Sequence, residues 1–176
     1  TRTGYTTTSK TSTSKAIPDK LYVGGTIKTN TVWPDGVTIV IRGPVSIAPG
    51  VTVTAQPGSV VKLSANATFV VDGSFVANGA ASRKVTITSL TDDAIGGDTD
   101  GGGASVGSLW PGITVGAGGS LSIMSSALRF GGVESQQHAA TVSVQNSTIL
   151  NAGLHLDTAA GRVQVDGNIV KNSPSD

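Results

Sequence analysis

Short apolar runs separated by polar, glycine-containing turns fill this chain, and in its last third they recur at a fixed step. Intervals of 21 residues separate Ile123, Val144 and Val165. A second series accompanies the first and comprises Leu128, Ile149 and Ile169. Repetition at a period of 20–50 residues is typical of a solenoid, in which each repeat is one coil stacked on the previous one.

The first half of the chain shows the same organisation. Three to five residues rich in Val, Ile and Thr form each predicted strand, and Gly, Pro, Asn or Asp marks each break. We expect one coil from strands at 37–41, 45–47 and 51–54, and the next from strands at 60–63, 68–71 and 75–77. Val40 and Val61, which are 21 residues apart, are expected to occupy equivalent positions in these coils. In every window, the apolar–polar alternation of a strand fits the sequence better than the apolar spacing of a helix.

A constant winding sense predicts parallel pairing between coils about 4.8 Å apart, with one inward Val, Ile or Leu stacked on the next. We therefore expect an all-β right-handed parallel β-helix with three short strands per coil of about 21 residues. The end coils would leave open strand edges that favour association or oligomerisation. The last predicted coil ends directly before the final residues, and no amphipathic helix is predicted to cover it. We therefore expect this chain to be part of a longer protein, or its end to be covered by a partner or a swapped segment.

Composition narrows the possible partners and compartments. A net charge of +1 with scattered Lys and Arg argues against nucleic acid, and no apolar run approaches the about 18 residues that cross a bilayer. The chain has 24 Gly, no Cys and only 13% charged residues, which together with abundant Thr and Ser favours an exported protein without disulfides. Residues 1–16 form a Thr/Ser-rich tract and are expected to be a linker, followed by the β-helix over 17–176.

Several stretches resemble the right-handed parallel β-helix repeats, of the pectate-lyase-like superfold, found in bacterial secreted and cell-surface proteins. The matching segments are GVTVTAQPGSVVKL (50–63), FVVDGSFVANGAASRKVTITSL (69–90), TDDAIGGDTDGGG (91–103), WPGITV (110–115) and LSIMSSALRFGG (121–132). The resemblance implies a secreted or surface location and a scaffold or adhesin role, with a surface glycan or a host or cell-surface protein as partner. It does not imply a reaction, because this group shares a fold more than an activity.

The segment 91–109 is an acidic, glycine-rich loop that interrupts the strand pattern. Asp92, Asp93, Asp98 and Asp100 lie within nine positions among five glycines. Hard oxygen ligands on a flexible loop suit Ca²⁺, and Asp98-Thr99-Asp100-Gly101 has the alternate spacing of a calcium loop. Four clustered carboxylates would repel one another unless they were neutralised. A solvated turn is the alternative, because Asp and Gly are also the usual turn residues.

Polysaccharide cleavage or carbohydrate binding is the alternative function. Pectin-degrading β-helices carry several motifs on one face, and of these the chain has only the Asp92-Asp93 pair. Its one Glu is Glu134, so a two-carboxylate glycosidase would need Asp from separate coils. His155 alternates outward between two Leu and is expected on the surface. Trp110 is a candidate for stacking on a sugar, although packing at the edge of the core is the alternative.

A structural or adhesive module of an exported bacterial protein is therefore the function that the sequence favours over an enzyme. A flat Thr array that binds ice or another surface is a third interpretation. It is disfavoured because Thr38, Thr52, Thr54, Thr86 and Thr88 do not recur at one coil step. We expect no catalytic residue and no cofactor other than the possible Ca²⁺.

Overall fold

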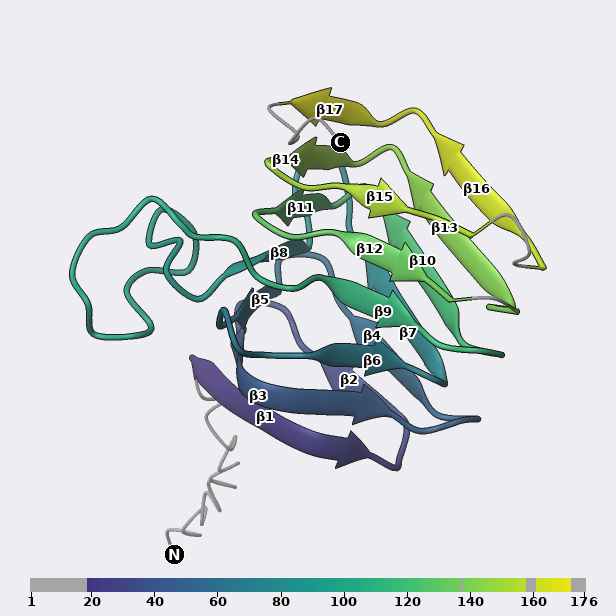
Figure 1. Ribbon diagram of the computed structural model, residues 1–176. Helices are drawn as coiled ribbons and strands as arrows, with labels where there is room; N and C mark the ends of the chain where they lie inside the picture. Colours follow the sequence, from purple (N-terminus) through teal and green to yellow (C-terminus); the bar gives the residue numbers. More distant parts are fainter. Residues whose placement is uncertain (1–18, 137, 158–160, 172–176) are drawn as a thin grey trace, which may run out of the picture.

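The computed structural model describes residues 19–136, 138–157 and 161–171, and these form a parallel β-solenoid of about 7 turns (Figure 1). The described residues contain no helix, and hence none that is long and apolar enough to span a membrane. The all-β parallel fold predicted from the sequence is confirmed. The predicted linker 1–16 and the last five residues lie outside the described part of the chain.

Short strands account for nearly all regular structure in the described residues. Their bounds are β1 Lys20–Ile27, β2 Thr31–Trp33, β3 Thr38–Ile47, β4 Thr52–Ala55, β5 Val60–Leu63, β6 Phe69–Val71, β7 Ser74–Asn78, β8 Thr86–Ser89, β9 Ile113–Val115, β10 Ser120–Met124, β11 Ala127–Arg129, β12 Val133–Ser135, β13 Thr141–Gln145, β14 Thr148–Leu150, β15 Leu154–His155, β16 Val163–Asp166 and β17 Ile169–Lys171.

The coils stack to give three strand faces. The first face contains β5, β8, β11, β14 and β17, the second contains β6, β9, β12 and β15, and the third contains β2, β4, β7, β10, β13 and β16. The long strand β3 spans two faces, because Thr38–Ile41 pairs with β5 and Val45–Ile47 pairs with β6. Its neighbour β1 follows it across both faces. All pairings between these named strands are parallel, as the constant winding sense requires.

The register confirms the main repeat, since Ile123 pairs with Val144 and Val144 with Val165. Two of the expected equivalences are wrong by one residue. Ile149 pairs with Val170 and not with Ile169, and Val61 pairs with Ile39 and not with Val40. A shift of one residue moves a side chain to the other face of a strand, so the inward positions decide the register. The coil length is about 22 residues, and the front coils accommodate the extra residue.

Buried apolar side chains from all three faces fill the interior, and the third face alone contributes two register rows, one through Phe75 and Leu121 and one through Ala77 and Ile123. In the front coils a cluster of three aromatic residues, Trp33, Phe69 and Phe75, is essentially inaccessible to solvent. The rings of Phe69 and Phe75 meet edge to face at a centroid distance of 5.0 Å, and Trp33 lies 5.5 Å from Phe75. These large side chains fill the wide centre of the coils, and each coil depends on its neighbours to cover it.

A polar ladder holds one corner of the back coils. The backbone N–H of Ser126 donates to the hydroxyl of Ser147 at 3.1 Å, and the N–H of Ser147 donates to the side-chain oxygen of Asn168 at 2.9 Å. The preceding residues, Ser125 and Asn146, have positive φ angles of 48° and 50° and turn the chain into the next strand. This corner recurs every 21 residues, so it explains the polar positions that the repeat shows in the sequence.

We expect Ser147→Ala to lower the free energy of unfolding by about 1–3 kcal/mol, because the buried N–H of Ser126 loses its acceptor. Urea denaturation followed by circular dichroism measures the change. Ser143→Ala is the matched control, since this half-buried hydroxyl faces outward from β13, the strand that precedes the corner. Equal stability of the two variants would contradict a structural role for the corner ladder.

Candidate functional site

The acidic loop 91–109 connects β8 to β9 and folds back over the outer side of the first face (Figure 1). Outward side chains that would otherwise meet water are buried beneath it, namely those of Val40, Lys62 and Thr88. These three residues are register partners on β3, β5 and β8. Gly96 packs so closely on this surface that an added Cβ would lie 3.1 Å from the hydroxyl of Thr38. The loop is therefore a packed layer on the solenoid.

Asp92 anchors the beginning of the loop. Its carboxylate is fully buried and accepts hydrogen bonds from the hydroxyl of Thr88 at 2.6 Å and from Nε of Arg129 at 2.8 Å. A second guanidinium nitrogen lies 3.4 Å from the other carboxylate oxygen. Charge-assisted, two-point contacts of this kind are among the strongest polar contacts in proteins. The Asp92 carboxylate is thus paired with Arg129 on β11, one coil further along the solenoid.

Trp110 anchors the end of the loop on the same residue. Its indole N–H donates to the backbone carbonyl of Arg129 at 2.8 Å, and only 4% of the residue is exposed. An added Cβ at Gly131 would run into the indole ring, so the ring lies directly on this glycine. The burial of Trp110 leaves no ring face for a sugar. The structure places it at the edge of the core, which was the alternative to sugar stacking.

Lys62 lies at the centre of the interface between loop and strands. It is fully buried, and its ammonium group donates to the carbonyl of Gly97 at 2.5 Å. The nearest carboxylate oxygen is Oδ1 of Asp93, 3.9 Å away. Removal from water lowers the pKa of Lys62, and the negative charge of Asp93 opposes that effect. A buried ammonium next to an acidic loop therefore supplies part of the charge that balances the carboxylates.

Two more basic side chains hold the outer part of the loop by its backbone. Lys20 on β1 donates to the carbonyl of Asp98 at 3.1 Å, and Arg42 on β3 donates to the carbonyl of Thr99 at 2.9 Å. Together with Lys62 and Arg129, they form a group of four cations from four coils that converge on one loop. The sequence suggested scattered basic residues. The sequence analysis missed Lys62, and its position between the inward residues Val61 and Leu63 is the signal that could have placed it on the outer face.

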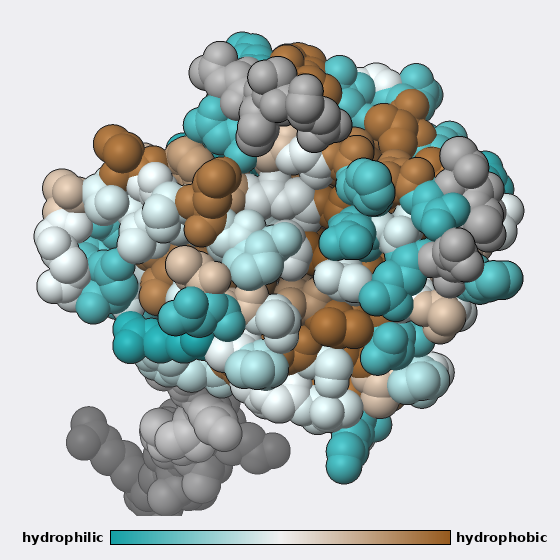
Figure 2. Space-filling view, viewed as in Figure 1, coloured by the Kyte–Doolittle hydropathy of each residue, from teal (hydrophilic) through white to brown (hydrophobic). Residues whose placement is uncertain are grey.

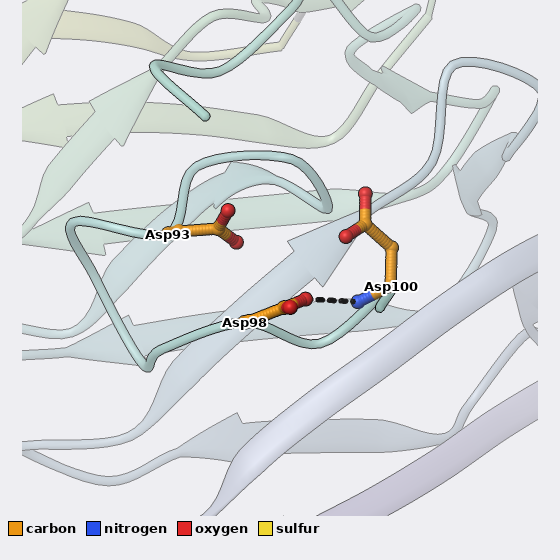
Figure 3. Close-up of side chains that lie close together, drawn as sticks. All are labelled: Asp93, Asp98 and Asp100. Carbon is orange, nitrogen blue, oxygen red and sulfur yellow. Dashed lines mark hydrogen bonds between the residues drawn. The ribbon is translucent and has the colours of Figure 1, made fainter. Parts of the chain in front are cut away.

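Three of the four candidate metal ligands come together within the loop. Carboxylate oxygens of Asp93, Asp98 and Asp100 lie within 4.8 Å of one another (Figure 3). Asp98 accepts backbone N–H groups, of which that of Gly101 is the closest at 2.7 Å, and these bonds lower the pKa of Asp98. Asp100 accepts the N–H of Gly102 at 2.9 Å. The fourth candidate, Asp92, is separated from this cluster by its pairing with Arg129.

Elsewhere the described strands contain two carboxylates. Glu134 lies on β12 in the second face and Asp166 lies on β16 in the third, so they do not share a groove. Glu134 pairs in register with His155, which is exposed as expected. Both line an open cavity of about 450 Å³, whose other walls are mostly apolar and include Leu154 and Val170.

Comparisons with protein-family models, with curated proteins and with solved structures gave no match to this chain. The geometry of the described residues is therefore the basis for inferring a function.

Proposed function

We propose that this chain is a structural or adhesive module of an exported bacterial protein, a solenoid scaffold that presents the 91–109 loop to a partner. The resemblance of its repeats to bacterial secreted β-helices supports the exported bacterial origin. The parallel β-solenoid supports the scaffold role, because stacked coils form an extended and repetitive surface.

The observation that carries this proposal is how carboxylates are distributed over the described strands. Glycosidases need two carboxylates about 5–10 Å apart that flank the scissile bond of the bound sugar. Glu134 and Asp166 lie on different faces of the solenoid. The clustered aspartates come from a single loop, and basic side chains hold that loop against the strands. The described strands therefore hold no pair of carboxylates from successive coils on one face.

The outer surface of the solenoid is mainly uncharged and polar. On the third face, successive coils place Thr52, Ser74, Ser120 and Thr141 in one register row. Figure 2 shows hydrophobic residues dispersed in small groups among hydrophilic and neutral ones on the visible face. Within the loop, Val106 and Leu109 are exposed apolar residues on the segment that returns to the strands, where Val106 bridges to Asp92. These two side chains are the candidates for partner contact in an adhesive module.

Adhesion is tested with the protein coupled to beads and applied to bacterial and mammalian cell surfaces. We expect bead retention to fall at least about fivefold for the double variant Val106→Ser/Leu109→Ser, since buried apolar area drives such contacts. Val32→Ser is the matched control, because Val32 is also exposed but lies on β2, away from the loop. Retention that is absent for the unmodified protein, or equal among the three proteins, would contradict the adhesive role.

Carbohydrate binding or cleavage is the second candidate function, and the cavity next to Glu134 and His155 is the observation that favours it. Incubation with pectins, alginates and glucans separates the two proposals. A scaffold should release no reducing ends and no unsaturated uronates from any of them. Release that disappears in Glu134→Gln would overturn the scaffold proposal and place the chemistry at this cavity.

A further inference from the structure

We propose that the acidic loop binds one calcium ion through the carboxylates of Asp93, Asp98 and Asp100. The three side chains all come from the first half of the loop and point toward one another (Figure 3). One oxygen from each lies within 4.8 Å of the other two, a separation that a single ion bridges at usual calcium–oxygen distances of about 2.3–2.6 Å. This inference goes beyond the scaffold role and does not depend on it.

A buried and unsatisfied oxygen provides the independent evidence for a ligand. The side chain of Asp93 is only 10% exposed, and its Oδ1 is buried without a hydrogen-bond partner among the described residues. The ammonium of Lys62 lies 3.9 Å from this oxygen, which is too far for a hydrogen bond. The other oxygen of this carboxylate, Oδ2, accepts the N–H of Ser105 at 2.9 Å. A buried carboxylate oxygen that accepts no hydrogen bond is costly, and such oxygens are rare in native proteins. A cation between the three carboxylates would satisfy it.

The chemistry of the donors selects calcium. All three ligands are carboxylates on a glycine-rich loop, and no His joins the cluster. Hard oxygen donors exclude a preference for zinc or copper. The loop supplies ligands of irregular geometry, with water completing the shell, which calcium tolerates and magnesium does not.

The neighbouring cations predict a modest affinity. Lys62 lies beside Asp93, and Lys20 and Arg42 bind the carbonyls of Asp98 and Thr99. These positive charges reduce the field that attracts an ion, and they occupy carbonyl oxygens that would otherwise join the shell. We expect a Kd of about 10⁻⁴–10⁻³ M, as in extracellular calcium modules.

The test is isothermal titration of the full chain with calcium chloride, after dialysis against a chelator. We expect one ion per chain, and Asp100→Asn should weaken binding at least tenfold. Asn keeps the oxygen that accepts the N–H of Gly102, so this variant removes the charge and preserves the turn. Asp166→Asn is the matched control, since it removes an exposed carboxylate from β16 and should leave the Kd within twofold.

Two further measurements keep the test decisive. Calcium should raise the Tm of the unmodified chain relative to chelator, because an ion bound only by the folded state stabilises it. Lys62→Met removes the competing ammonium and should tighten binding several-fold. No saturable binding below about 10 mM calcium, a Tm unchanged by chelator, or equal weakening in Asp100→Asn and Asp166→Asn would each overturn the site.

Discussion

Replacing Arg129 with Met should lower the free energy of unfolding by about 3 kcal/mol, as judged by urea denaturation. The substitution leaves the fully buried carboxylate of Asp92 without its cation, and removing one partner of a buried ion pair typically costs about 3–5 kcal/mol. We place the effect at the lower end because 23% of the Arg129 side chain is exposed. The first part of the loop should also become sensitive to limited proteolysis, since Asp92 anchors it.

Two further variants show whether the ion pair causes this loss. The double variant Asp92→Asn/Arg129→Met should be more stable than Arg129→Met alone, because no uncompensated charge remains buried. Arg162→Met is the control for the loss of a surface guanidinium and should change stability by less than about 0.5 kcal/mol. If Arg129→Met behaves like Arg162→Met, the pairing with Asp92 does not stabilise the fold.

Phe75→Ala should lower the free energy of unfolding by about 3–5 kcal/mol. Phe75 is fully buried and packs against both Trp33 and Phe69, so the truncation leaves a cavity and breaks two aromatic contacts. The strand β7 that carries it pairs with β4 on one side and β10 on the other. The cavity therefore lies between the front and back coils of the solenoid.

Trp33 provides a local probe of this effect, because it packs on Phe75, whereas Trp110 packs on Gly131 in a later coil. In a stack of repeats each coil is stabilised mainly by its neighbours, so the front coils should unfold before the back coils in Phe75→Ala. Tryptophan fluorescence should then change at a lower urea concentration than circular dichroism. Val76→Ala, at the outward position next to Phe75, should cost less than about 1 kcal/mol. Coincident transitions with unchanged stability would show that the aromatic cluster does not join the coils.

The repeat pattern predicted the fold closely where inward residues are uniform. Ile123, Val144 and Val165 pair as expected, because each is a β-branched residue at the same inward position. The prediction was wrong by one residue where two adjacent residues are both apolar. Val40 and Ile169 are as hydrophobic as Ile39 and Val170, so hydrophobicity did not show which of them faces inward.

The candidate site was predicted in part. The spacing of the aspartates suggested one cluster, and the structure brings Asp93, Asp98 and Asp100 together. Asp92 differs because it meets Arg129, a residue 37 positions later in the chain. Its partner depends on which coil lies next to the loop, and spacing within the loop contains no such information.

The sequence by itself determined that the chain is a parallel solenoid with an acidic loop, because the inward apolar residues of stacked coils recur at a regular interval along the sequence. Tertiary structure alone decided where that loop lies and what balances its charge. Lys20, Arg42, Lys62 and Arg129 are far apart in the sequence, and only stacking of their coils at about 4.8 Å brings them to one surface. Long-range pairing thus set the electrostatics of the site, and local pattern set the architecture.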